Sequence, residues 1–325
     1  MRNDQQEFKA ARFIKEIGRG QKGARSISRE EARELYTAML DGRVSDIELG
    51  ALLLAMRIKG ESVDELAGFL EAAHDSFAPL PAPGGDYAPV LIPSYNGSRK
   101  LPNLTPLLAL LLAREGVPVL VHGVTVDPGR ITTAEILAEL GVPASATSAD
   151  VAAAFAAHRP AFMPITALAP KLAHMLSLRA ILGVRNSTHT LVKILQPFDG
   201  PALRLVSYTH PEYLQTLSEY FMLDAGAGRG DAFLMRGTEG ETVANPHRGQ
   251  QIDWFNRGVR TLLAERDAPT DELAELPEGR DAAGTAAWIE AVLRGEAPVP
   301  APIAGQVAHC VAAARSIRAG SVPSA

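Results

Sequence analysis

Apolar residues recur every three to four positions through the first 76 residues, and polar residues mark where each helix begins. A first amphipathic stretch runs from Phe8 to Ile17 and ends at Gly18. Each of three further helices follows a serine that stands three residues before a glutamate. In this capping-box pattern the serine caps a backbone amide and the glutamate reaches back. The pairs are Ser28 with Glu31, Ser45 with Glu48 and Ser62 with Glu65, and they predict helices over Arg29 to Asp41, Asp46 to Lys59 and Val63 to Ser76.

The pattern changes after a proline- and glycine-rich hinge, Pro79 to Gly85. A short apolar strand at Val90 to Ile92, a helix at Thr105 to Arg114 introduced by Asn103, and a β-branched strand at Val117 to Val121 predict a βαβ unit and hence a parallel sheet. Ligands of such sheets gather at the carboxyl ends of the strands. Two polar loops leave those ends, Ser94 to Lys100 and His122 to Thr132, and a small-molecule or phosphate site would be built from them.

Strands and helices continue to alternate along the rest of the chain, except that two helices near residues 166–196 follow each other without a strand between them. We expect this helical pair to pack on the first module. The predicted domains are therefore residues 1–76, joined by that pair, and residues 77–325 without it. Further strands are predicted at Ala161 to Met163, Leu203 to Ser207, Asp231 to Met235 and Gln251 to Phe255, and further helices at Thr133 to Leu140, Ala149 to His158, Ala167 to Leu182, Thr188 to Leu195, Pro211 to Met222, Ala282 to Leu293 and Ile303 to Arg318.

The composition, 46% hydrophobic and 21% charged, is that of an ordinary globular protein. The polar start has no signal-peptide core, and the longest apolar stretch, Leu104 to Ala113, contains Pro106 and is too short to span a bilayer. We therefore expect a cytoplasmic protein without a membrane partner. The single cysteine, Cys310, excludes an internal disulfide and is expected in the core, and no Cys/His spacing suggests zinc.

Charge is distributed unevenly around a net value of −5. The segment from Glu265 to Asp281 carries seven acidic and two basic residues, whereas Lys9 to Arg25 carries six basic residues and one acidic residue. Within the basic segment, the loop Gly18 to Ser26 has three glycines and is either a phosphate-binding loop or a flexible connector. The basic residues are Lys9, Arg12, Lys15, Arg19, Lys22 and Arg25.

The order of these parts resembles the anthranilate phosphoribosyltransferase family and the nucleoside-phosphorylase class of the same architecture. The resemblance runs over nearly the whole chain. It implies a small all-helical domain and a large α/β domain with a mostly parallel sheet, and a homodimer formed through the helical domain. The motifs SYNGSRK, VHGV, GRITTAEIL, LGVRNSTHTL and GTEGE resemble the YbiB-type branch of transferase-like paralogues, described as nucleic-acid-binding proteins.

Departures from the transferase pattern lie in the ligand loops. The family's GTGGD loop, whose glycines leave amides open to a diphosphate, corresponds to Ser94-Tyr95-Asn96-Gly97-Ser98, with one glycine and a bulky tyrosine. The family's KHGN corresponds to Val121-His122-Gly123-Val124, which lacks the lysine and the asparagine. The serine-rich phosphate loop has become Asp127 to Thr133, where a carboxylate would repel phosphate without a metal.

Two further family positions have matches. The Asp-Glu pair that holds magnesium matches Glu239 and Glu241, which would face one side of an extended segment and share a hydrated Mg²⁺, or would form a solvated acidic turn. The arginine that meets the anthranilate carboxylate matches Arg185, which alternatively binds phosphate or a structural carboxylate. No residue needs to act as a covalent nucleophile, because orientation and charge stabilisation can suffice.

The leading hypothesis is sequence-independent binding of single- or double-stranded nucleic acid through its phosphates, with no required cofactor and no anthranilate phosphoribosyltransferase activity. The alternative is a working transferase that uses phosphoribosyl pyrophosphate, Mg²⁺ and another acceptor, and a third reading is a retired enzyme kept as a scaffold. For the alternative, the ligand residues are Ser94, Asn96, Gly97, Ser98, His122, Gly123 and Arg185, with Glu239 and Glu241 as metal ligands. For nucleic acid, the residues are the six of the basic segment with Arg99, Lys100, Lys171, Arg179, Arg185 and Lys193, which either merge into one positive groove or form ordinary solvated faces.

Overall fold

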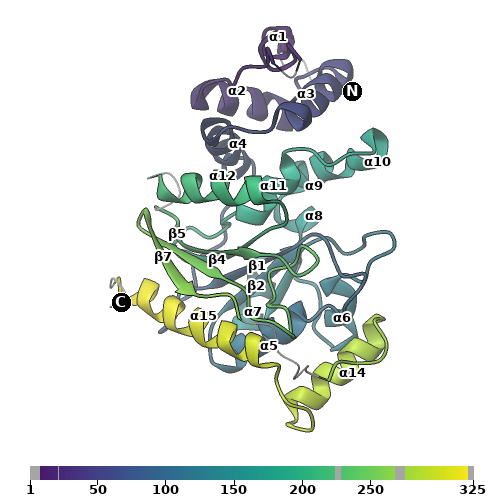
Figure 1. Cartoon of the computed structure of the whole chain (residues 1–325), viewed down its shortest axis with the longest axis vertical. Coiled ribbons are helices and arrows are strands. Elements are labelled where there is room, and N and C mark those ends of the chain that lie inside the picture. Colours follow the sequence, from purple (N-terminus) through teal and green to yellow (C-terminus); the bar gives the residue numbers. More distant parts are fainter. Residues whose placement is uncertain (1–7, 21, 224–227, 268–274, 321–325) are drawn as a thin grey trace. The chain divides into compact units, whose positions relative to one another are not determined.

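A computed structural model describes the chain except residues 1–7, 21, 224–227, 268–274 and 321–325 (Figure 1). The chain divides into two compact units. Unit 1 comprises Met1–Pro79 and Ala169–Leu195, and unit 2 comprises Leu80–Leu168 and Gln196–Ala325. Part of the predicted acidic segment, including Asp271 and Glu272, lies outside the described residues. No helix in the described ranges is both long and apolar enough to cross a bilayer.

Unit 1 is a helical bundle. Tyr36 and Thr188 join its two chain segments, because their buried side-chain oxygens are 2.7 Å apart. Close packing of the second and fourth helices depends on Gly68, where a Cβ atom would lie 2.2 Å from the carbonyl oxygen of Arg29. The helices are α1 (Ala11–Ile17), α2 (Arg29–Leu40), α3 (Asp46–Lys59), α4 (Val63–Asp75), α9 (Pro170–Ser177), α10 (Arg179–Leu182) and α11 (Thr188–Ile194).

Two local predictions in unit 1 need correction. The capping boxes at Ser28 and Ser62 are confirmed, but the Ser45 hydroxyl accepts no amide and instead donates to the Glu48 carboxylate at 2.7 Å. The single helix predicted over Ala167 to Leu182 is wrong. It is divided into α8 (Ile165–Leu168), which belongs to unit 2, and α9 and α10 of unit 1. The first break lies at Pro170, which has no N–H to continue a helix and therefore begins a new one.

Unit 2 contains one seven-stranded sheet in the order β3-β2-β1-β4-β5-β6-β7. The first five strands are parallel and the last two are antiparallel, so the predicted α/β domain with a mostly parallel sheet is confirmed. The strands are β1 (Val90–Ser94), β2 (Val119–Gly123), β3 (Ala161–Pro164), β4 (Ala202–Tyr208), β5 (Gly230–Arg236), β6 (Ile252–Asn256) and β7 (Val259–Ala264).

Helices cover both faces of this sheet (Figure 1). Leu203, Leu205 and Phe233 point into an apolar core that also contains Cys310, so the predicted core position of the thiol is confirmed. Strand residues of opposite parity face the other side, where the buried Arg204 guanidinium lies 5.0 Å from the ring centroid of Phe221. This core is covered by α5 (Thr105–Arg114), α6 (Thr133–Glu139), α14 (Ala282–Leu293) and α15 (Ala301–Ala319). The opposite face carries α12 (Pro211–Met222), and α7 (Ser148–Ala156) packs beside β3.

Strand β7 was not predicted. It follows β6 through Arg257 and Gly258, which both have positive φ, 47° and 79°. Two such residues form the two-residue hairpin turn that matches strand twist. Most of β7 is exposed, so it lacks the apolar alternation that a sequence-based assignment depends on.

Candidate functional site

The loop after β1 donates its backbone amides to a carboxylate of the same chain. Glu241 Oε1 accepts the N–H groups of Asn96 and Gly97 at 2.9 and 2.7 Å. All three residues are buried. Amides that converge on one oxygen form an anion site, and here the anion is supplied by Glu241.

A second carboxylate binds the next part of the same loop. Glu239 accepts the backbone N–H of Arg99 and, at 2.8 Å, that of Lys100. The Asn96 side-chain amide also donates to the carbonyl oxygen of Gly240 at 2.8 Å. Four backbone amides and one side-chain amide of the Asn96–Lys100 loop are therefore bound by the segment that contains the two glutamates.

That segment is a tight turn. Thr238 and Glu241 exchange both backbone hydrogen bonds at 3.0 Å, while Glu239 and Gly240 have φ values of 54° and 96°. The predicted extended conformation of Glu239 to Glu241 is therefore wrong. The two carboxylates accept different pairs of amides, and no cluster of three or more metal-ligating side chains occurs among the described residues.

The carboxyl ends of β1 and β2 are filled by their own side chains. The Tyr95 hydroxyl lies 2.7 Å from His122 Nδ1, and the Ser94 hydroxyl donates to Thr133 at 2.7 Å. Burial lowers the pKa of His122 to about 3, so its ring is neutral at pH 7 and brings no charge to a phosphate. At Gly123, a Cβ atom would lie 1.8 Å from the Ser94 carbonyl oxygen, so the strands meet too closely for any side chain there.

The two predicted ligand loops bind each other. Ser98 and Ile131 exchange backbone hydrogen bonds at 2.9 Å in both directions, and the Arg130 side chain donates to the Gly97 carbonyl oxygen at 3.2 Å. The structure therefore brings the predicted phosphate residues of unit 2 together, but their polar groups hold the loops rather than line an open cradle. These residues are Ser94, Asn96, Gly97, Ser98, His122 and Gly123.

The basic segment of unit 1 retains exposed cations. Arg12 pairs with Glu34 at 2.7 Å, and Arg19 pairs with Glu16 at 2.8 Å. The other four cations are exposed and have no ion pair within the described part of the chain. They are Lys9, Lys15, Lys22 and Arg25.

A second basic group surrounds His189 in the later helices of unit 1. Burial, together with the positive charges of Arg185, Arg179 and Lys193, lowers the pKa of His189 to about 4. These three cations therefore lie close enough to share one positive region, with a neutral imidazole among them. Lys171 does not add to it, because it pairs with Asp41 at 2.7 Å.

The predicted single groove joins two groups that pack on different helices of unit 1. Helix α1 of the basic segment packs on α3, whereas α9 packs on α2 and α11 packs on α4. The groove remains a prediction.

Unit 2 carries its own exposed cations beside the carboxylate turn. Arg99 and Lys100 are exposed there, and Arg280 donates to the Arg99 carbonyl oxygen at 3.0 Å. Sequence reasoning missed Arg280 and three arginines that line a nearby pocket, Arg236, Arg248 and Arg266. A usable signal existed only for Arg236, which directly follows a predicted strand.

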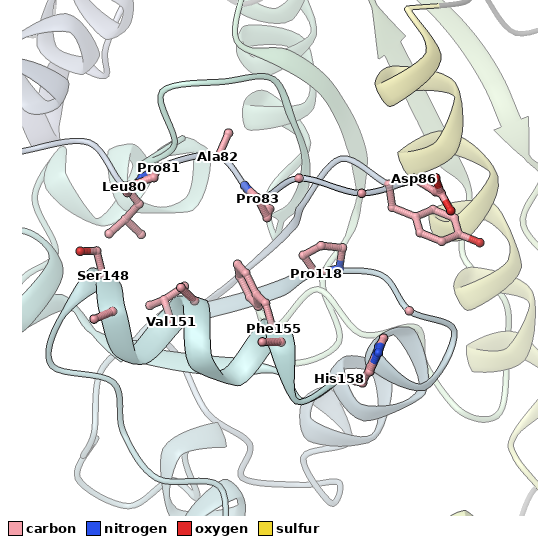
Figure 2. Close-up of a pocket in the computed structure, with 17 residues that line it drawn as sticks. Leu80, Pro81, Ala82, Pro83, Asp86, Pro118, Ser148, Val151, Phe155 and His158 are labelled. Atoms are coloured by element: carbon pink, nitrogen blue, oxygen red, sulfur yellow. The ribbon is translucent and has the colours of Figure 1, made fainter.

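A cavity of about 770 Å³ lies elsewhere in unit 2, at the amino ends of the strands. Figure 2 shows the segment with Leu80, Pro81 and Pro83 along one side of it and α7, with Val151 and Phe155, along the other. Its walls are largely apolar, so it does not provide the cations or converging amides that a phosphate site needs.

Comparison with known proteins places these features in a family. Residues 11–77 match the helical bundle domain of a glycosyl transferase family. The chain is 46% identical over 304 residues to the protein YbiB of Escherichia coli (strain K12), covering 93% of each chain. It is 28% identical over 279 residues to the anthranilate phosphoribosyltransferase of Methylocella silvestris, covering 83% of this chain and 76% of that one.

Solved structures share the fold. The anthranilate phosphoribosyltransferase of Thermus thermophilus superposes with a TM-score of 0.70 at 24% identity, covering 96% of this chain and 90% of that one. The Saccharomyces cerevisiae enzyme, in complex with PRPP and Mg, also has a TM-score of 0.70, at 13% identity, covering 97% and 91%.

Proposed function

The chain belongs to the YbiB branch of the anthranilate phosphoribosyltransferase-like superfamily, and we propose that it binds nucleic acid through its phosphates without reading the sequence. The protein uses no cofactor for this and does not transfer phosphoribosyl groups to anthranilate. The single observation that carries the proposal is the occupation of the diphosphate loop by Glu239 and Glu241.

A protein can bind phosphate through free backbone amides or through side-chain cations, and the occupied loop bears on the first of these. A transferase needs free amides to hold the diphosphate of its donor while charge moves to the leaving group. Here a diphosphate would have to displace the buried Glu241 carboxylate from the amides of Asn96 and Gly97. Phosphates are bound instead by exposed side-chain cations, which suit the repeating charge of a polynucleotide.

Two groups of cations in unit 1 support this proposal. Four cations of the basic segment lack ion pairs within the described residues, and three more surround His189. Lysine and arginine contacts to phosphates give affinity and register but little sequence information. The expected ligand is therefore any single or double strand, with affinity that falls steeply with salt.

The homodimer is also a proposal, supported by an apolar stripe on α3. Ile47, Leu54 and Ile58 are 87%, 47% and 66% exposed, and their spacing of seven and four residues puts them on one face of the helix. A row of large exposed apolar side chains marks a protein interface more often than a free surface. We assign it to a second copy of this chain, because two-fold pairing would also double the basic segment along one ligand.

The direct test measures fluorescence anisotropy of random-sequence single- and double-stranded DNA over a range of salt concentrations. Changing Lys15, Lys22 and Arg25 together to alanine should weaken binding to all sequences about equally. It should also make the slope of log affinity against log salt shallower by roughly two to three, at about 0.7 to 0.9 per lost contact. A comparison variant changes Arg12 and Arg19, which already have carboxylate partners, to alanine, and its slope should change less per charge removed.

The same protein sample also tests the transferase alternative. Phosphoribosyl pyrophosphate with Mg²⁺ should bind far more weakly than to a working enzyme, because Glu239 and Glu241 occupy the loop amides. Tight binding of this donor together with no binding of DNA would overturn the proposed function and favour a transferase with another acceptor.

A further inference from the structure

A separate pocket of unit 2 is lined by three arginines from distant parts of the chain. It has a volume of about 410 Å³, within the range of small-molecule sites. Arg236 comes from the end of β5, Arg248 from the loop after the carboxylate turn, and Arg266 from the residues after β7. Tyr208 at the end of β4 forms another part of the wall.

The three guanidinium groups have no carboxylate partner among the described residues. Arg236 and Arg266 are exposed, and the half-buried Arg248 donates through Nε to the backbone carbonyl oxygen of Asp267 at 2.8 Å. Each planar guanidinium group can donate to two phosphate oxygens at once, so three such groups suit a phosphate ligand.

The nearby carboxylates are held by backbone amides. Glu239 lines the pocket, but its oxygens accept the N–H groups of Arg99 and Lys100. The Asp267 side chain accepts the Gly249 N–H at 2.6 Å. These amides partly offset the negative charge, so the three arginines dominate the field inside the pocket.

The pocket is formed before any ligand arrives. Gly249 and Asp267 are joined by backbone as well as side-chain hydrogen bonds, which fix the Arg248 loop to the chain after β7. The Gln250 side chain donates to Thr238 at 3.2 Å and ties the same loop to the carboxylate turn. A preformed site loses little entropy on binding.

We propose that this arginine pocket binds one nucleotide, with its phosphate on Arg236, Arg248 and Arg266. The Tyr208 ring offers a surface for a base or sugar. The side-chain amides of Asn245 and Gln251 also lie at the wall, where Asn245 accepts the His247 N–H and Gln251 donates to Asp253. The nucleotide is either free or part of a longer strand. In the second case the inference rests on the proposed function and places one backbone phosphate of the bound strand in unit 2.

The test uses the full-length protein and two probes, adenosine 5′-diphosphate and an oligothymidylate of about twenty nucleotides. Changing Arg236, Arg248 and Arg266 together to glutamine should weaken diphosphate binding, measured by calorimetry, at least about tenfold. The slope of log oligonucleotide affinity against log salt should become shallower by roughly 0.7, because the three arginines neutralise one backbone phosphate.

The matched control removes the same amount of charge elsewhere in unit 2, by changing Arg159, Arg229 and Arg257 to glutamine. It should bind both probes as tightly as the wild type. A second variant, Arg236→Gln with Arg266→Gln, keeps the Arg248 contact to Asp267 and so protects the fold. Its binding of the diphosphate should still fall several-fold.

The outcomes separate the pocket from the proposed function. If the wild type binds adenosine diphosphate through these arginines but no oligonucleotide, the pocket stands and nucleic-acid binding fails. If the pocket variants bind both probes as tightly as the wild type, the pocket assignment is overturned whether or not DNA binds. A wild type that binds neither probe overturns both.

Discussion

Replacing Glu241 by alanine should destabilise unit 2 far more than replacing Glu239. The Glu241 carboxylate is buried and accepts two buried amides, those of Asn96 and Gly97. The alanine variant leaves both donors without an acceptor. Glu239 accepts amides of Arg99 and Lys100, which are exposed and can bind water instead.

The magnitude follows from these contacts. Each buried donor left unsatisfied costs about 1–3 kcal/mol, so Glu241→Ala should cost about 2–6 kcal/mol, at the lower end if water enters the space. For a domain of roughly 200 residues, about 2–4 °C of melting temperature corresponds to each kcal/mol. We therefore expect a decrease of at least about 4 °C. Glu239→Ala should stay within about 0.5 kcal/mol of the wild type, as for other surface positions.

Thermal unfolding followed by circular dichroism measures both variants at pH 7. Added pyrophosphate supplies the missing anion, so it should raise the melting temperature of Glu241→Ala more than that of the wild type, in which only the arginine pocket binds a phosphate. Glu241→Gln keeps an oxygen acceptor and should show an intermediate value. If Glu241→Ala melts within about 1 °C of the wild type, or pyrophosphate stabilises both proteins equally, the carboxylate does not fill an anion site.

Three further predictions follow from the same structure. The folded-state pKa values of His122 and His189, about 3 and 4, lie below the ordinary 6.5. The unfolded chain therefore takes up protons that the folded chain does not. The unfolding free energy should fall as the pH is lowered from about 6.5 to 4, and denaturant titrations at each pH would measure this fall. The fall should be smaller in His189→Gln. Ile47→Glu combined with Ile58→Glu should give a monomer by sedimentation at micromolar concentration, while the control Val126→Glu, at another exposed apolar site, should sediment as the wild type. Anthranilate and phosphoribosyl pyrophosphate should give no turnover near one per second, and turnover at that rate would contradict the account of the occupied loop.

The regular elements were largely predictable from the sequence. Helices at Asp46–Lys59, Pro211–Met222 and Ala282–Leu293 begin and end where the pattern of caps and apolar residues predicts. The parallel sheet followed from the βαβ unit around Val90 to Val121, because apolar runs and glycine-bearing loops are local signals. Edge strand β7 escaped prediction because its side chains are exposed.

The chemistry of the strand-end loops was only partly predictable. The sequence singled out Glu239 and Glu241, but their role depends on a turn that brings them to amides about 140 residues away in the chain. The arginine pocket likewise combines residues from three segments, and no local pattern marks Arg248 or Arg266 as neighbours of Arg236. Spacing along the chain describes one segment at a time, whereas a pocket depends on which segments meet.

Gly240 determines the conformation of the turn that occupies the Asn96–Lys100 loop. Its φ of 96° suits glycine, and a Cβ atom there would lie 2.6 Å from the Asn96 side-chain nitrogen. A larger residue at this position would strain the turn and crowd the Asn96 side chain. The closed loop therefore requires glycine at position 240 as much as it requires the two glutamates, because the turn is what holds Glu241 against the amides of Asn96 and Gly97.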